Sequence, residues 1–106
     1  MLNIIFKPNT LELEIKGHAE YGNDGEDIVC AAISSLFYTL YETLNQSADM
    51  QEKAPEFKDE HGDGYLRSYP KKKYGGNIAC IYRTILIGFE LIANNYNENV
   101  TFKVEG

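Results

Sequence analysis

A cysteine and a histidine twelve residues apart are the side chains of this protein best suited to chemistry. His18 lies in a polar, glycine-rich segment, and Cys30 lies just inside an apolar segment with helical spacing. A thiolate is a strong nucleophile, and a nearby imidazole can take up its proton and later return it to a leaving group. The residue types and their spacing therefore predict a nucleophilic thiol site where a loop meets a helix.

The helix that carries Cys30 is expected to span about 27–45. Apolar residues recur at helical spacing along it, at Val29, Ala32, Ile33 and Leu36. This repeat is one buried face of an amphipathic helix. Asp27 is the natural N-cap, because its carboxylate can accept hydrogen bonds from the free N–H groups of the first turn. Cys30 then lies in that turn, where the helix dipole and the N–H groups favour a thiolate.

Two further polar side chains are expected to support the pair. Asp27 precedes Cys30 by three residues and Ser34 follows it by four, so the three share one stripe of the helix. Either Asp27 or Ser34 can orient the imidazole or the substrate, and the sequence leaves this choice open. The loop before the helix contains glycines at Gly17, Gly22 and Gly25. Their conformational freedom predicts a flexible segment able to close over a substrate.

Each of these residues also has a purely structural interpretation. A lone cysteine on a helix is most often a small core residue, and a lone loop histidine is usually solvated. An aspartate can cap a helix without any part in catalysis, and a helical serine can bond back to a carbonyl of the preceding turn. Pattern and spacing alone leave these alternatives open.

The same stretch resembles the signature of a known family. The motif consists of Gly17-His18-Ala19, then Gly25, then Asp27-Ile28-Val29-Cys30-Ala31-Ala32-Ile33-Ser34. It is similar to that of the ribosomal-processing cysteine protease family, Prp, and the likeness in length and order of elements covers essentially the whole chain. The resemblance implies that His18 and Cys30 form a catalytic dyad, with Asp27 and Ser34 in or beside the site.

The resemblance also implies a substrate and an assembly. Family members are small homodimeric cysteine endopeptidases that remove a short N-terminal extension from the precursor of a large-subunit ribosomal protein. Their extensions end with aromatic residues, which implies an apolar groove in the enzyme. We therefore expect ribosomal protein processing by a homodimer, with the ribosomal protein precursor as partner and no cofactor.

Composition predicts a small globular protein of the cytoplasm. The chain has 106 residues, of which 43% are hydrophobic and 25% charged, so a single domain over 1–106 with its own core is expected. The N-terminus lacks a signal-peptide pattern, and no apolar run of about twenty residues is evident. The two cysteines are expected as free thiols in a reducing compartment. These features predict a cytoplasmic location and no membrane partner.

The formal net charge of −6 indicates the class of partner. Nucleic-acid binding needs clustered Lys and Arg, so this charge disfavours it, whereas a basic ribosomal protein would be attracted. Two other classes of function remain open. One is a non-catalytic ribosome-assembly module that binds a basic ribosomal protein. The other is a redox protein using Cys30 and Cys80, which the lack of a Cys-x-x-Cys pair disfavours.

Periodicity predicts the elements that must position the site. Strands are expected at 2–7, 10–16, 56–59, 65–69 and 100–104, and helices at 27–45 and 77–95. Residues 46–54 are expected to be a helix end and linker, with Cys80 in the core and a hairpin turn at Asp63-Gly64. The order β-β-α-β-β-α-β predicts a two-layer α+β fold, with a mainly antiparallel sheet and both amphipathic helices on one face.

Two further groups of side chains concern possible contacts at the surface. Tyr38 and Tyr41 provide more aromatic surface than one sheet face requires, so they are expected either to meet a second subunit or to be partly exposed. His61, beside Glu60 and Asp63, lacks a second His or Cys at ligand spacing, so no metal site is expected there.

Overall fold

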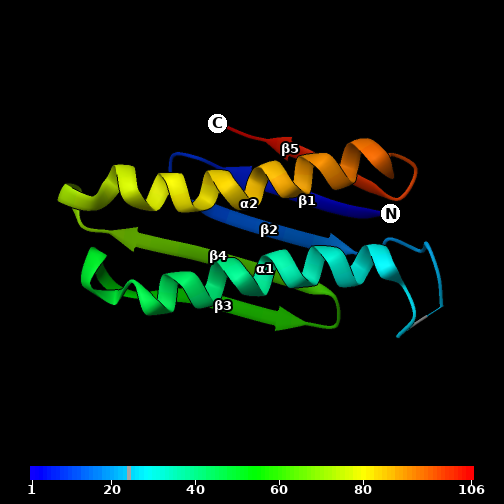
Figure 1. The fold of residues 1–106 in the computed structure, drawn as a ribbon, viewed down its shortest axis with the longest axis horizontal. Helices are drawn as coiled ribbons and strands as arrows, with labels where there is room; N and C mark the ends of the chain where they lie inside the picture. The colour runs from blue at the N-terminus through cyan, green and yellow to red at the C-terminus, as the bar shows by residue number, and fades with distance from the viewer. Residues whose placement is uncertain (24) are drawn as a thin grey trace.

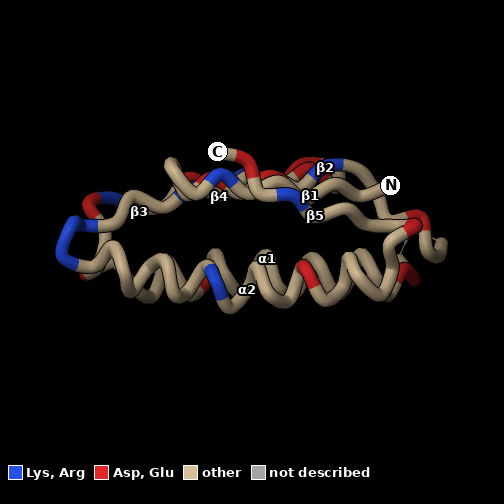
Figure 2. The backbone as a smooth tube through the Cα atoms, turned by 90° about the horizontal axis from the view of Figure 1, so that it is seen from above, with Lys and Arg blue, Asp and Glu red and all other residues tan. Residues whose placement is uncertain are grey.

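The computed structural model describes residues 1–23 and 25–106 and has the expected two-layer α+β architecture (Figure 1). The described strands form one sheet in the order β3-β4-β2-β1-β5: β1 Leu2–Lys7, β2 Glu12–Gly17, β3 Gln51–Glu60, β4 Asp63–Pro70 and β5 Val100–Val104. The helices are α1 Ile28–Gln46 and α2 Gly75–Asn95, with short 3-10 turns η1 Ala48–Met50 and η2 Lys72–Tyr74. Figure 2 shows both long helices on the same face of the sheet.

The sheet is antiparallel except at one edge. Its antiparallel pairs are β1 with β2, β2 with β4 and β3 with β4, whereas β5 pairs parallel with β1. The predicted alternation in β2 is confirmed, because Leu13 and Ile15 are buried under the helices while Glu12 and Glu14 are only partly covered. β2 lies near the middle of the sheet, so His18, the next residue after it, follows a well-anchored strand.

β3 is longer than the sequence predicted. Residues 51–54, expected in a linker, form its first part. Their polar character concealed the strand, because β3 lies at the sheet edge and most of its side chains are exposed. Pro55 lacks an N–H group, and an edge strand whose pairing register shifts nearby tolerates it. Gln51 anchors the start of β3, since its buried amide donates to the Leu44 carbonyl at 2.6 Å.

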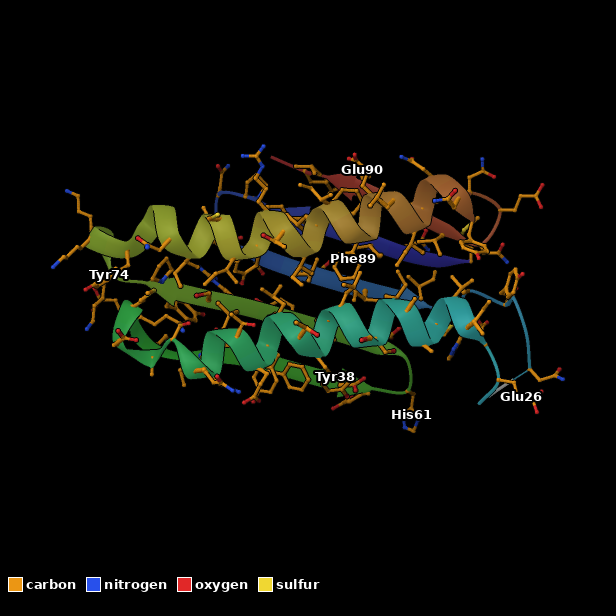
Figure 3. All side chains as sticks on the ribbon, viewed as in Figure 1. Glu26, Tyr38, His61, Tyr74, Phe89 and Glu90 are labelled. Atoms are coloured by element: carbon orange, nitrogen blue, oxygen red, sulfur yellow. The ribbon has the colours of Figure 1, made fainter. Side chains whose placement is uncertain are left out.

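The turn between β3 and β4 lies at His61-Gly62 and not at Asp63-Gly64. His61 and Gly62 have φ values of 50° and 89°, which are typical of a two-residue type I′ hairpin. Figure 3 shows the His61 side chain pointing away from the rest of the molecule. Asp63 instead begins β4, and its carboxylate accepts a hydrogen bond from the Gly17 N–H at 3.2 Å. The turn is thereby tied to the end of β2.

The aromatic side chains of α1 pack on β3 of the same chain. Phe57 stacks on Tyr41 with ring centroids 3.8 Å apart and on Phe37 with centroids 5.4 Å apart. Tyr38 also contacts Phe57, with centroids 5.7 Å apart, and keeps 46% of its surface exposed. These rings join α1 to the edge strand, so the far half of α1 is fixed above the β3–β4 hairpin.

α2 covers the other half of the sheet with one buried face. The face consists of Ile78, Tyr82, Ile85, Phe89 and Ala93. The expectation that Cys80 is a core residue is wrong, because its side chain is exposed. Two residues after Ile78, Cys80 is rotated by about 200° around the helix, on the side opposite the buried face.

The stretch Lys72–Asn95 is long and apolar enough to span a membrane, judged by length and composition alone. This finding differs from the expectation that the chain has no apolar run of about twenty residues. The stretch is apolar because Arg83 and Glu90 are the only charged residues between Lys73 and Glu98. The core helix of a soluble protein passes the same test, and here α2 packs its buried face against the sheet and beside α1.

Candidate active site

Cys30 lies in the first turn of α1, as predicted. Oδ1 of Asp27 caps the helix by accepting hydrogen bonds from the N–H groups of Val29 at 2.9 Å and Cys30 at 3.0 Å. The thiol is half-buried, and its sulfur accepts a hydrogen bond from the Ala19 N–H at 3.4 Å. The sulfur thus lies beside the start of α1 and next to a backbone N–H group.

The other carboxylate oxygen of Asp27 holds the preceding loop against the helix. Oδ2 accepts hydrogen bonds from the N–H groups of Tyr21 at 2.9 Å and Gly22 at 3.2 Å. Burial disfavours the charged form and raises the pKa of Asp27, but the four backbone N–H groups outweigh it, so this pKa lies below its ordinary value of 3.8. The described hydrogen bonds of Asp27 thus fix backbone around Cys30.

The start of the loop before α1 is closely packed and hydrogen-bonded. A Cβ on Gly17 would lie 2.4 Å from the Met1 carbonyl oxygen, and the φ of Gly17 is 91°, so only glycine fits there. The Asn99 amide donates to the Ala19 carbonyl at 2.9 Å. Flexibility at Gly22 and Gly25 stays a prediction, and Asp24 lies outside the described residues.

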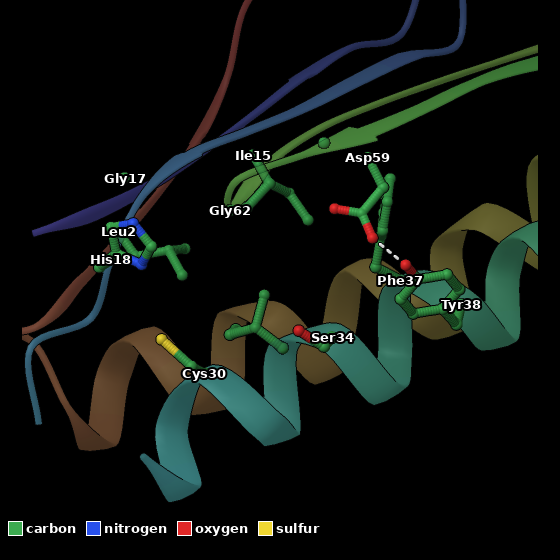
Figure 4. Close-up of a pocket in the computed structure, with 12 residues that line it drawn as sticks. Leu2, Ile15, Gly17, His18, Cys30, Ser34, Phe37, Tyr38, Asp59 and Gly62 are labelled. Atoms are coloured by element: carbon green, nitrogen blue, oxygen red, sulfur yellow. Dashed lines mark hydrogen bonds between the residues drawn. The ribbon is translucent and has the colours of Figure 1, made fainter. Parts of the chain in front are cut away.

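His18 lies against the β3–β4 turn. A Cβ on Gly62 would lie 2.7 Å from Cε1 of His18, so the imidazole occupies the space that any larger side chain would need. Figure 4 shows His18 and Cys30 on facing walls of one pocket, with the sulfur directed toward the space between them. Among the described residues, no hydrogen bond joins the two side chains. They are brought together by β2, the hairpin turn and the start of α1.

The pocket between these elements has a volume of about 110 Å³ and is mainly apolar. Its apolar side chains are Leu2, Ile15, Ile33 and Phe37. Ser34 lines it one turn after Cys30, as the shared stripe predicted, whereas Asp27 is not part of the lining. Tyr38 and Asp59 line the end away from His18 (Figure 4).

Comparison with known proteins shows the family of this chain. The family model for cysteine protease Prp matches residues 1–101. This chain belongs to the Prp family. The ribosomal processing cysteine protease Prp of Staphylococcus aureus is 27% identical to it over 84 residues, which are 79% of this chain and 76% of that protein. The protein is accordingly a cysteine protease, and this prediction from the sequence is confirmed.

Solved structures confirm the Prp fold. The crystal structure of Prp from S. aureus with a covalently linked product peptide has a TM-score of 0.79 over 99% of this chain and 100% of that chain, at 22% identity. A crystal structure from Streptococcus mutans has a TM-score of 0.68 over 97% of this chain and 90% of that one, at 27% identity. These likenesses cover both layers of the fold.

Sequence reasoning missed Tyr38 and Asp59, the two polar side chains at the far end of the pocket. Tyr38 follows Ser34 by four residues and so continues the stripe of Cys30 and Ser34 along α1, a signal that was present in the sequence. Asp59 comes from β3, and no spacing relates it to the motif. Within residues 1–23 and 25–106, no three His, Cys, Asp or Glu side chains gather in a way that could hold a metal ion.

We predict that Asp27→Asn lowers the free energy of unfolding by about 1–2 kcal/mol at neutral pH. Asparagine keeps an oxygen for the helix cap but presents an amide donor to the N–H groups of Tyr21 and Gly22. Because the pKa of Asp27 is lowered by folding, the carboxylate stabilises the protein above its ordinary pKa of 3.8, and this contribution is lost as pH falls through the lower folded value.

Denaturant unfolding from about pH 7 to about pH 2 measures this effect. The stability difference should persist down to about pH 4 and shrink only as the pH falls further, toward the lowered folded pKa of Asp27. Glu26→Gln removes a neighbouring exposed charge and should match the wild type. A stability difference that stays constant over the whole pH range would contradict the role of the Asp27 charge.

We predict that Gly62→Ala displaces the His18 ring, because the new Cβ would lie 2.7 Å from Cε1. Gly25→Ala is the matched control, since Gly25 also has a positive φ, of 80°, but no atom lies within 4 Å of the added Cβ. Both variants should lose about 1–2 kcal/mol of stability through backbone strain. Only Gly62→Ala should shift the imidazole resonances of His18 in an NMR spectrum, and equal shifts in both would show that the contact is unimportant.

Proposed function

We propose that this protein is an endopeptidase that removes a short N-terminal extension from the precursor of a large-subunit ribosomal protein. Cys30 is the nucleophile and His18 the general acid and base. The observation that carries the proposal is the single pocket that presents both side chains, in a chain of the Prp family.

The chemistry is acyl transfer in two steps. The Cys30 thiolate attacks the scissile carbonyl carbon, and backbone N–H groups near the start of α1 stabilise the negative charge that forms on the oxygen. Protonated His18 gives its proton to the departing amine, the C–N bond breaks, and a thioester on Cys30 remains. His18 then takes a proton from water, the hydroxide attacks the thioester, and the carboxylic acid product and the thiolate are released.

Asp27 and Ser34 have different roles in this proposal. Asp27 is a positioning residue, because its carboxylate binds the backbone of Cys30 and of the loop that follows His18. Ser34 contacts the substrate, because it lines the pocket one helical turn beyond Cys30. The sequence left open whether Asp27 or Ser34 orients the imidazole or the substrate, and this proposal gives each residue one role.

Several features support a peptide from a ribosomal protein precursor as the substrate. Two solved structures of S. aureus Prp hold a covalently linked product peptide and a substrate peptide, and the S. aureus relative is a ribosomal processing cysteine protease. The apolar side chains around Ile33 and Phe37 suit an aromatic residue at the end of the extension. The net charge of −6 attracts a basic ribosomal protein.

Mass spectrometry of a synthetic peptide tests the catalytic proposal. The peptide copies the N-terminal extension of the host's own precursor and the residues after it. We expect one cut by the wild type, none by Cys30→Ala, and a rate about 10²- to 10⁴-fold lower for His18→Ala. Cys80→Ser is the control for thiol loss, because Cys80 is exposed on α2 and outside the pocket; it should cleave normally.

Two results would contradict the catalytic proposal. Cleavage that persists in Cys30→Ala would assign the nucleophile elsewhere. Binding of the peptide by the wild type without any cut would favour the non-catalytic assembly module.

We also propose that the protein works in the cytoplasm, since ribosome assembly takes place there. We further propose that it is a homodimer. Ile87 and Leu91 support the dimer: they lie one turn apart on the outer face of α2, with 50% and 58% of their surfaces exposed, and apolar surface of this kind gains from burial. Sedimentation equilibrium should give twice the chain mass of 12.0 kDa. Leu91→Glu should shift the equilibrium toward monomer, and a wild type that is monomeric at micromolar concentration would contradict the proposal.

A further inference from the structure

The pocket has a second polar end, away from Cys30. The residues Cys30, Ser34 and Tyr38 follow one another at intervals of four along α1 and all line the pocket. At the far end, the Tyr38 hydroxyl donates a hydrogen bond to the carboxylate of Asp59, which projects from β3 (Figure 4). The mainly apolar pocket therefore joins the thiol at one end to a carboxylate at the other.

Asp59 carries the only carboxylate among the described residues that line this pocket. No Lys or Arg of residues 1–23 and 25–106 forms an ion pair with it. The adjacent Lys58 lies in a different groove, with Glu14 and Lys16. The negative charge at this end of the pocket is thus left without a cation from the described part of the chain.

Tyr38 holds this carboxylate in a defined orientation. Its ring contacts Phe57 and Phe37, with centroids 5.7 Å and 6.0 Å apart, so the hydroxyl is carried by a packed side chain. One hydrogen bond to Tyr38 leaves the remaining lone pairs of the Asp59 carboxylate available. An oriented carboxylate at the end of an apolar pocket is suited to a Lys or Arg side chain, which can lay its methylene stem along the apolar wall.

The length of α1 gives the place of this subsite relative to the scissile bond. Tyr38 lies eight residues after Cys30, which is about 12 Å along the helix axis at about 1.5 Å per residue. An extended peptide covers about 3.3 Å per residue. The distance therefore corresponds to three or four substrate residues.

We propose that Asp59, oriented by Tyr38, binds a Lys or Arg side chain of the substrate three or four residues from the scissile bond. The inference rests on the proposed function, in which Cys30 cuts a peptide that lies extended along the pocket. The competing structural role is edge protection, since a charge on an edge strand such as β3 discourages pairing with another sheet; that role predicts no effect of substrate charge.

A lysine scan of the substrate tests the subsite. Each position from four residues before the cut to four after it is replaced in turn by Lys, Gln or Glu in an otherwise neutral peptide, and kcat/KM is measured. With the wild type we expect one position, three or four residues from the cut, at which Lys exceeds Gln by about three- to tenfold and Glu falls below Gln. The preference should shrink at high salt, because the pair is exposed.

The variants separate recognition from structure. Asp59→Asn should abolish the Lys preference while still cleaving the Gln peptide, Asp59→Lys should favour the Glu peptide at that position, and Tyr38→Phe should weaken the preference. Asp49→Asn is the matched control, since it removes an equal charge on η1, beyond the far end of α1; it should retain the full Lys preference.

The peptide scan separates failure of the Asp59 subsite from failure of the proposed function. If the wild type cuts none of the peptides, the proposed function fails. If it cuts them all with no positional Lys preference, or if Asp59→Asn keeps the preference, only the Asp59 subsite is overturned.

Discussion

The region around Cys30 depends on one carboxylate that accepts hydrogen bonds from four backbone N–H groups. Asp27 joins the first turn of α1 through one oxygen and the preceding loop through the other. Without a negatively charged acceptor, the N–H groups of the helix start and of the loop would compete for water, and the segment between His18 and Cys30 would have no fixed course. The geometry around the thiol therefore follows from a helix cap.

The pocket also depends on glycines, which allow backbone and side chains to approach one another closely. The hairpin turn can lie beside the imidazole because Gly62 has no Cβ, and the Phe37 ring can reach the sheet because a Cβ on Gly64 would lie only 2.9 Å from it. Gly17 likewise lets the end of β2 pass the Met1 carbonyl. These contacts join segments far apart in sequence, so the close approaches at the glycines fix how the walls of the pocket lie relative to one another.

The pocket combines an apolar lining with a polar group at each end. Apolar walls exclude water and strengthen the electrostatic interactions at the thiol. Aromatic packing of α1 on Phe57 sets the distance between helix and edge strand and thus the width of the groove. One cluster of rings therefore serves both the stability of the edge strand and the shape of the pocket.

The sequence by itself determined the α+β class, the order of elements, the N-cap at Asp27 and the place of Cys30 in the first turn, because each follows from local periodicity or capping chemistry. It also pointed to the Prp family, through the motif from Gly17 to Ser34. It misjudged residues 51–54 and Cys80, since the burial of an edge strand or a helix face depends on what packs against it. Only the tertiary structure decided that Gly62 contacts His18 and that Asp59 enters the pocket, because these contacts come from strand pairing across the sheet, which leaves no spacing signal in the chain.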